Sequence, residues 1–181
     1  MTLFGRKIRA LSALALIACP AFVQQLASVA APQPSEYEVK AAFILNFTRF
    51  IEWPPSAPDS DARFTICILG EDPFGKVLED AVAGERVNDR PIVVRRLRQP
   101  GRGCEILFFP KSEKGAARTL PETGPGVLTV GETPEFLHLG GMIAFSVENR
   151  RVRFDVNQTA ATRASLQISS KLLNVARSVE R

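Results

Sequence analysis

Three short, continuously apolar runs constrain the fold of this chain most strongly. They are RFTICILG at 63–70, CEILFFP at 104–110 and GVLTV at 126–130. Each has the length of a strand and is rich in β-branched or aromatic residues, which is typical of strands buried in a mostly parallel sheet. PIVVRRL at 91–97 has the same character and adds a further strand. These runs predict a sheet at the centre of the domain.

A helix is predicted before the first strand. Ser35 and Glu38 form a capping-box pattern, so the helix is expected to begin there and to run to about Trp53. Pro54 and Pro55 follow at once and end it. A helix of this length can cover several strands of the predicted sheet.

Three further helices are expected. DPFGKVLEDAVAG at 72–84 is predicted to start with Asp72 as its N-cap and with proline at the first helical position. The segment 112–120 is a weaker helix. Asn157 is expected to cap a long helix that continues to about Val179. With the strands, these segments alternate along the chain, which favours an α/β arrangement.

The segment 142–156, MIAFSVENRRVRFDV, alternates on both sides of Glu148 to Arg151 and predicts a β-hairpin. The preceding GETPEFLHLGG is interpreted as a loop. We therefore expect an α/β sandwich with a mostly parallel, mixed sheet, an antiparallel hairpin at one side and helices on both faces. A chain of 181 residues with 45% apolar content suffices for one such domain.

The N-terminal residues are predicted to be a cleaved signal peptide. RKIR at 6–9 precedes the apolar run ALSALALIACPAFV, and the small residues Ser28 and Ala30 suit cleavage after Ala30. The run is interrupted by polar residues and proline, whereas a membrane-spanning helix needs roughly 20 mostly apolar residues. An alternative is a lipoprotein anchored through Cys19, because LIAC resembles a lipobox. The predicted organisation is a signal peptide at 1–30, a short linker at 31–35 and one domain at 36–181.

Without this leader the net charge is small. The formal charge of +4 includes three basic residues and no acidic residue of the leader, which leaves +1 for the rest. A nucleic-acid partner is therefore not expected, since such a partner requires a basic excess on the domain itself. One local excess, with Arg95, Arg96, Arg98 and Arg102, is interpreted as a solvated strand end and turn.

Two cysteines, Cys67 and Cys104, remain after the leader. In an oxidising compartment an even number of cysteines indicates pairing, so we predict a disulfide between them. The alternative is two buried free thiols.

Nothing in the sequence indicates catalysis, a cofactor or a metal site. His138 is the only histidine, and no nucleophile motif or ligand cluster of familiar spacing accompanies it. Asp72 follows a predicted strand, where α/β folds bind ligands, but capping of the next helix explains it as well. We therefore predict a protein that is not an enzyme.

The first helix carries one amide on its apolar face. At 100° per residue, Asn46 lies among Val39, Phe43, Phe47 and Phe50. An unpaired buried amide costs about 1–3 kcal/mol, so Asn46 is expected either to bridge to the backbone of another element or to face a pocket. Lys40 lies at the edge of the same face and could extend its charged end outwards.

The motifs quoted above resemble those of a known family. VKAAFILNFTRFIEWP is similar to the opening signature of the YfiR-like family of periplasmic repressor proteins, and TICILGEDPFG, CEILFF, GGMIAFSVENRRVRFDVN and ISSKLLNVAR resemble its later motifs in the same order. The resemblance covers residues 36–178. It implies an exported α/β domain that represses a membrane-bound diguanylate cyclase through the periplasmic sensory domain of that enzyme, lowers cyclic di-GMP and so has a role in biofilm regulation.

The resemblance also bears on the cysteines. The best-known member of the family carries two disulfides, and Cys67 and Cys104 match one of those pairs. The second pair is missing from this chain, so redox control that depends on it does not transfer.

A repressor that acts by contact needs apolar surface, and two regions are expected to provide it. On the predicted C-terminal helix, Leu166 and Leu173 lie opposite the core stripe and are either covered by another element or exposed to a partner or a second copy of the chain. In the loop, Phe136, Leu137 and Leu139 are similar candidates. The rival to contact with a membrane signalling protein is a module that binds a small molecule and signals to such a protein.

Overall fold

The computed structural model describes residues 33–55, 62–113, 120 and 123–181. The signal peptide predicted at 1–30 and most of the helix predicted at 112–120 lie outside these residues and stay predictions. Within the described ranges, no helix is both long and apolar enough to cross a membrane.

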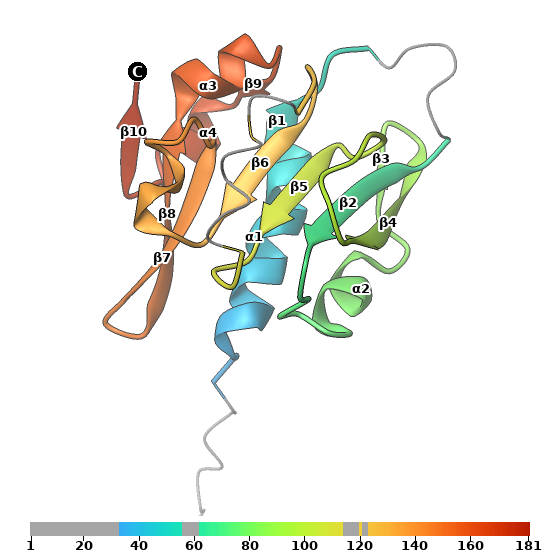
Figure 1. Cartoon of the computed structure of the whole chain (residues 1–181), viewed down its shortest axis with the longest axis horizontal. Helices are drawn as coiled ribbons and strands as arrows, with labels where there is room; N and C mark the ends of the chain where they lie inside the picture. Colours follow the sequence, from blue (N-terminus) through green and yellow to red (C-terminus); the bar gives the residue numbers. More distant parts are fainter. Residues whose placement is uncertain (1–32, 56–61, 114–119, 121–122) are drawn as a thin grey trace, which may run out of the picture. The chain divides into compact units, whose positions relative to one another are not determined.

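The strands of the main sheet follow the predicted apolar runs. Among the described residues this sheet has eight strands in the order β10-β8-β7-β6-β5-β2-β4-β3. From β7 to β4 the neighbours are parallel, whereas β8 is antiparallel to β7 and β3 is antiparallel to β4. The predicted α/β fold with a mostly parallel sheet and an antiparallel hairpin is confirmed (Figure 1). The strands that correspond to the apolar runs are β2 (Phe64–Leu69), β4 (Arg90–Leu97), β5 (Ile106–Phe109) and β6 (Leu128–Gly131).

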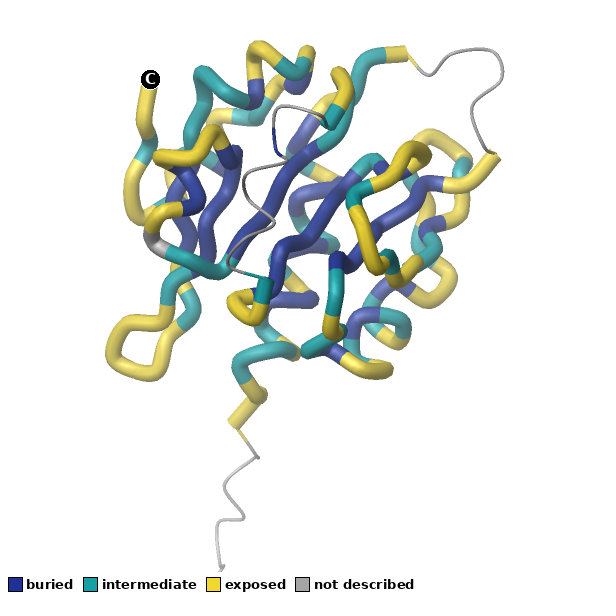
Figure 2. The backbone as a smooth tube through the Cα atoms, in the orientation of Figure 1, coloured by how far each residue is buried: buried dark blue, intermediate teal, exposed yellow. Residues whose placement is uncertain are grey.

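The central strands are buried on both faces, as Figure 2 shows. Alternate residues such as Ile66 and Phe108 enter the larger core cluster, which includes residues of α1 (Glu36–Phe50) and α2 (Val77–Val82). The residues between them, such as Leu107, enter a second cluster with Phe136 at the end of the 3-10 helix η2 (Pro134–Phe136). Burial on both sides explains why these strands are continuously apolar.

The start of α1 is as predicted. The Ser35 hydroxyl accepts a hydrogen bond from the Glu38 N–H, and the Glu38 carboxylate accepts one from the Ser35 N–H. Phe47 is fully buried, and its ring centroid lies 5.9 Å from that of Phe145 and 5.4 Å from that of Phe154. These ring contacts hold the helix against the hairpin strands of the sheet.

The end of α1 differs from the prediction, since the helix stops at Phe50. Ile51 and Glu52 form the short strand β1 (Ile51–Glu52), which pairs antiparallel with β9 (Gln167–Ile168). This pairing satisfies the backbone with a segment that is distant in sequence, and Pro54 then disfavours helical geometry at Trp53.

The prediction of a long C-terminal helix is wrong. Asn157 does cap a helix, because its side chain accepts from the Ala160 N–H, but α3 (Gln158–Arg163) is short. Ser165 has a φ of +62°, and the N–H groups of Leu166 and Ser165 donate to the carbonyls of Ala161 and Thr162. This is a Schellman motif, which reverses the chain. The remaining elements are β9, α4 (Ser170–Leu173) and β10 (Ser178–Glu180).

The predicted hairpin consists of β7 (Ile143–Glu148) and β8 (Arg151–Asn157). Asn149 and Arg150 have φ values of +50° and +61°, which is the backbone of a type I′ turn. A second hairpin, between β3 (Arg86–Val87) and β4, was not predicted, although its Asn-Asp turn uses the same positive φ values.

Candidate functional site

The loop residues expected to contact a partner are mostly buried. Phe136 is 1% exposed and Leu137 6% exposed, so the expectation that they form free surface is wrong. The η2 turn folds Phe136 over two glycines, where a Cβ at Gly131 or Gly141 would lie 2.4 or 2.2 Å from its ring. Phe136 therefore closes the second core cluster. Leu139 is 45% exposed and remains available for contact.

Leu166 and Leu173, the candidate contact residues near the C-terminus, do not lie on an exposed helix face. The helix predicted to carry them is interrupted after α3. Leu166 is 2% exposed and Leu173 is half-buried against the larger core cluster. Val175, two residues after Leu173, is 61% exposed. The change of direction at Ser165 rotates these side chains away from the faces that a continuous helix would give them.

Asn46 is half-buried rather than buried. In the part of the chain that the structure describes, its side chain takes part in no hydrogen bond, so the predicted backbone bridge is not found. Trp53, expected at the end of the same helix, lies beyond it and donates from Nε1 to the Glu105 carbonyl at 3.3 Å.

The predicted disulfide is present. Cys67 in β2 is joined to Cys104, just before β5, with their Cα atoms 5.8 Å apart. Arg95 of β4 covers the bridge: its Nη2 lies 3.4 Å from the Cys104 Sγ and donates to the Arg102 carbonyl at 2.7 Å. The disulfide thus ties neighbouring strands at one face of the sheet, and Arg95 belongs to this structure rather than to a freely solvated cluster.

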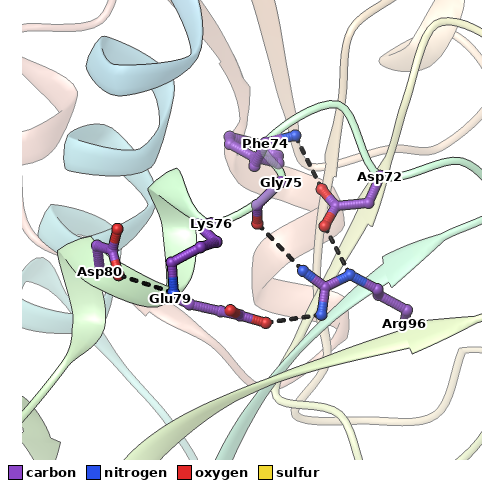
Figure 3. Close-up of polar contacts among 7 residues, drawn as sticks. All are labelled: Asp72, Phe74, Gly75, Lys76, Glu79, Asp80 and Arg96. Atoms are coloured by element: carbon purple, nitrogen blue, oxygen red, sulfur yellow. Dashed lines mark hydrogen bonds and ion pairs between the residues drawn. The ribbon is translucent and has the colours of Figure 1, made fainter.

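Asp72, at the carboxyl side of β2, is part of a clamp around Arg96 (Figure 3). Its Oδ1 accepts from the Phe74 N–H at 2.8 Å and its Oδ2 from Arg96 Nε at 2.7 Å. Arg96 also donates to Glu79 at 2.7 Å and to the Gly75 carbonyl at 3.1 Å. The pKa of the Glu79 carboxyl is lowered, chiefly by the hydrogen bond from Arg96.

This clamp corrects the capping prediction. The helix α2 begins four residues later than expected, with Lys76 at its N-cap position and no side-chain capping bond. The turn between Asp72 and Phe74 and the three partners of Arg96 use the polar groups at this end of the sheet. They join β4 to the loop before α2, which is a structural role.

A buried ion pair lies at the carboxyl end of β6, where the sequence indicated no site. The Lys40 Nζ is 2.5 Å from the Glu132 Oε1, and the two side chains are 3% and 2% exposed. Lys40 also pairs with Glu36, one turn earlier in α1. The Glu132 Oε2 accepts from the Lys111 N–H at 3.0 Å. The pair therefore joins α1 to the ends of β5 and β6. The expectation that Lys40 could extend its charged end to solvent is wrong, because the side chain is buried.

Tyr37 shares this environment. Its ring lies 4.7 Å below the Lys40 Nζ and packs edge-on against Phe74 at 5.2 Å between centroids. Burial, followed by the negative charge of Glu132, raises the pKa of the Tyr37 phenol from its usual 10.0 to about 12. The sequence signal that could have revealed this cluster is the Glu36 to Lys40 spacing on a face that is otherwise apolar.

A third polar cluster joins the hairpin to the segment before β10. Arg177 Nε donates to Asp155 Oδ1 at 2.8 Å, and other nitrogens of the same guanidinium pair with Asp155 Oδ2 and Glu148 Oε1. Ser178 donates to the same Asp155 carboxylate at 2.6 Å. Burial raises the pKa of Asp155, but the hydrogen bonds from Arg177 and Ser178 outweigh it and leave the pKa lowered.

Metal ligation receives no support from the described ranges, which contain no group of three or more histidine, cysteine or acidic side chains placed to hold an ion. His138 is exposed in the loop after η2.

The fold and the disulfide define a mixed α/β domain suited to an oxidising compartment. More specifically, the chain belongs to the YfiR/HmsC-like family, whose model matches residues 37–177. This family consists of periplasmic regulators. The match confirms the resemblance seen in the sequence motifs.

A solved structure shows the same fold. It is a conserved domain protein from Vibrio cholerae O1 biovar El Tor strain N16961, with 10% sequence identity and a TM-score of 0.53. The similarity covers 81% of this chain and 60% of that chain, so this chain spans about three fifths of its length. Among curated protein sequences, none matches this chain.

Proposed function

We propose that this protein is an exported regulator that represses a membrane-bound diguanylate cyclase by binding the periplasmic sensory domain of that enzyme. It acts by contact rather than by turnover, and its effect is to lower cyclic di-GMP. The observation that carries the proposal is the family match over residues 37–177, which includes nearly the whole described domain.

Two features of this chain support the proposal. The disulfide between Cys67 and Cys104 suits a protein that works outside the reducing cytoplasm. Apolar side chains remain on the surface after the core is made, with Leu139, Val147 and Val175 between 45% and 61% exposed. Scattered exposed apolar residues are common, so they support a contact function without locating it.

The test begins with deletion of the gene in its host. Cyclic di-GMP, measured by mass spectrometry, should rise on deletion and return on expression of the wild-type chain. In a strain that also lacks the partner cyclase, deletion should have no effect. The partner is identified by co-purification of the tagged mature protein with solubilised inner membrane.

An unchanged level of cyclic di-GMP, in a host whose candidate cyclase is active, would contradict repression. A module that binds a small molecule would then be the better function. That function predicts a rise in the unfolding temperature with one member of a metabolite panel, because a ligand that binds the folded state stabilises it by mass action.

A further inference from the structure

The β7–β8 hairpin extends beyond the part of the sheet that α1 covers. Its tip is exposed, and Figures 1 and 2 show it at the lower left, away from the buried strands. The strands remain in register to the end, with Val147 opposite Val152 and Glu148 opposite Arg151. The type I′ turn matches the twist of the strands, and Arg177 pairs with Glu148 directly before the turn, so the tip has a defined conformation.

The two faces of the hairpin differ in chemistry. Because side chains alternate along a strand, Val147 and Val152 share the face of the buried Phe145 and Phe154. The opposite face presents polar residues only. We call this the arginine face and define it as Ser146, Glu148, Arg151 and Arg153, with Asn149 and Arg150 at its tip.

The charges on the arginine face are unevenly matched. Arg177 engages the carboxylates of Glu148 and Asp155, so both acidic groups near the hairpin already have a cation. Arg150, Arg151 and Arg153 are exposed, and no carboxylate of the described residues pairs with them. A cluster of three uncompensated guanidinium groups is notable in a domain whose charge without the leader is only +1.

The same face is also concave and incompletely hydrogen-bonded. Glu148, Asn149, Arg151 and Arg153 line an open depression. Beside it, the Ser146 Oγ is buried and has no hydrogen-bond partner within the described residues. Buried polar groups are nearly always paired in folded proteins, so the unpaired Ser146 hydroxyl is unusual.

We infer that the arginine face docks an acidic segment of the membrane partner, with carboxylates of that segment on Arg151 and Arg153. This inference rests on the proposed function and names the surface that performs it. Arginine is suited to the role because its fork of N–H groups accepts a carboxylate through two hydrogen bonds.

A protein segment fits this face better than a lipid surface. A carboxylate and an amide, Glu148 and Asn149, line the depression together with the arginines, so the face offers acceptors as well as donors. Val147, 48% exposed, lies on the other side of the same hairpin. A groove that takes both sides of the hairpin can use these groups together, whereas a bilayer surface attracts only positive charge.

The test measures binding of the mature protein to the purified periplasmic domain of the co-purified cyclase by calorimetry at several salt concentrations. The variant is the double substitution Arg151→Glu and Arg153→Glu. Its matched control is Arg98→Glu and Arg102→Glu, which reverses two exposed arginines at the other side of the sheet and changes the net charge equally. Thermal melts followed by circular dichroism establish that each variant is folded.

The hairpin variant is expected to weaken the Kd at least tenfold and to flatten its dependence on salt, because rim charges govern steering and salt sensitivity. The control should change the Kd less than threefold. If the charge reversal unfolds the hairpin, Arg151→Gln with Arg153→Gln removes the guanidinium groups without adding carboxylates, and the same loss of affinity is expected.

Three results would overturn the inference. Equal Kd values for the folded hairpin variant and the wild type place the contact elsewhere while leaving the proposed function intact. Loss of co-sedimentation with phosphatidylglycerol vesicles, at unchanged affinity for the periplasmic domain, assigns the face to the membrane. Failure of the wild-type protein to bind the periplasmic domain at all removes the proposed function, and the docking site with it.

Discussion

Replacing Lys40 with methionine is expected to destabilise the domain by about 3–5 kcal/mol, because the change leaves a carboxylate buried without its cation. Lys40 and Glu132 are 3% and 2% exposed, so neither can turn to water. After the substitution, the Lys111 N–H at 3.0 Å still donates to Glu132, but no cation faces this carboxylate within the described residues. In a domain of this size the loss corresponds to a fall in melting temperature of roughly 6–20 °C.

The partner substitution should cost less. Glu132→Gln keeps an acceptor for the Lys111 N–H, and Lys40 keeps Glu36, whose side chain is 37% exposed. We expect a loss of about 1–3 kcal/mol. The double variant, Lys40→Met with Glu132→Gln, removes both charges and should be at least ~1 kcal/mol more stable than the sum of the single effects predicts.

The assay is urea denaturation of the mature protein followed by circular dichroism and by the fluorescence of Trp53. Lys76→Met is the matched control, because Lys76 and Asp80 form a pair 3.6 Å apart whose side chains are 81% and 68% exposed. That change should alter the free energy of unfolding by less than about 1 kcal/mol. A Lys40→Met variant as stable as this control, or strictly additive single effects, would refute the account of the buried pair.

Three further predictions address other parts of the domain. Tyr37 is the only tyrosine, so absorbance at the tyrosinate band should show its phenol ionising near pH 12 in the folded protein and near 10 in urea. Because folding raises the pKa of Tyr37, its neutral phenol contributes to the free energy of unfolding fully below pH 10, and this contribution is lost as the pH rises towards 12. Ionisation near pH 10 in the folded state would contradict this. Reducing the Cys67–Cys104 bridge, whose cysteines are 37 residues apart, should lower the free energy of unfolding by about 4 kcal/mol in the chain-entropy model, and a loss below ~1 kcal/mol in urea titrations with and without reductant would argue against that role. Phe136→Ala should destabilise by about 3–5 kcal/mol while Leu139→Ala changes little; equal melting temperatures would show that Phe136 is not a core residue.

Local signals account for most of the predictions that the structure confirms. The capping box of Ser35 and Glu38 requires groups three residues apart, so it can be recognised without knowledge of the fold. The turn at Asn149 and Arg150 is likewise a property of a few neighbouring residues. The buried strands are recognisable because burial on both faces demands continuous apolar sequence.

The wrong C-terminal helix shows the limit of periodicity. Ala161, Ala164, Ile168 and Leu172 recur at helical spacing, and all are at least half-buried in the structure. They reach the same core from α3, β9 and α4 in turn, because Ser165 ends the first helix in the left-handed region. Glycine usually occupies this position at the end of a helix, so the serine does not indicate from the sequence that the helix ends here.

The predicted contact surface failed for a related reason. Phe136 lies in a segment without periodicity and Leu166 lies off the helical stripe, so the exposure of either side chain depends on what the chain places over it. Phe136 packs over Gly131 and Gly141, and a turn precedes Leu166. The order of residues along the chain does not reveal either contact. Exposure is a tertiary property. The arginine face of the hairpin could be recognised only from the structure, which shows that Glu148 and Asp155 are paired with Arg177.

What the sequence by itself determined is the set of local choices: one exported α/β domain by expectation, its main strands, the first helix, the hairpin and a pair of cysteines. The pairing of Lys40 with Glu132, of Asp72 with Arg96 and of β1 with β9 was decided only by the tertiary structure. The physical reason is distance along the chain. Capping, turn and strand signals act between near neighbours, whereas the free energy of a buried charge depends on a partner far along the chain: Glu132 lies 92 residues from Lys40.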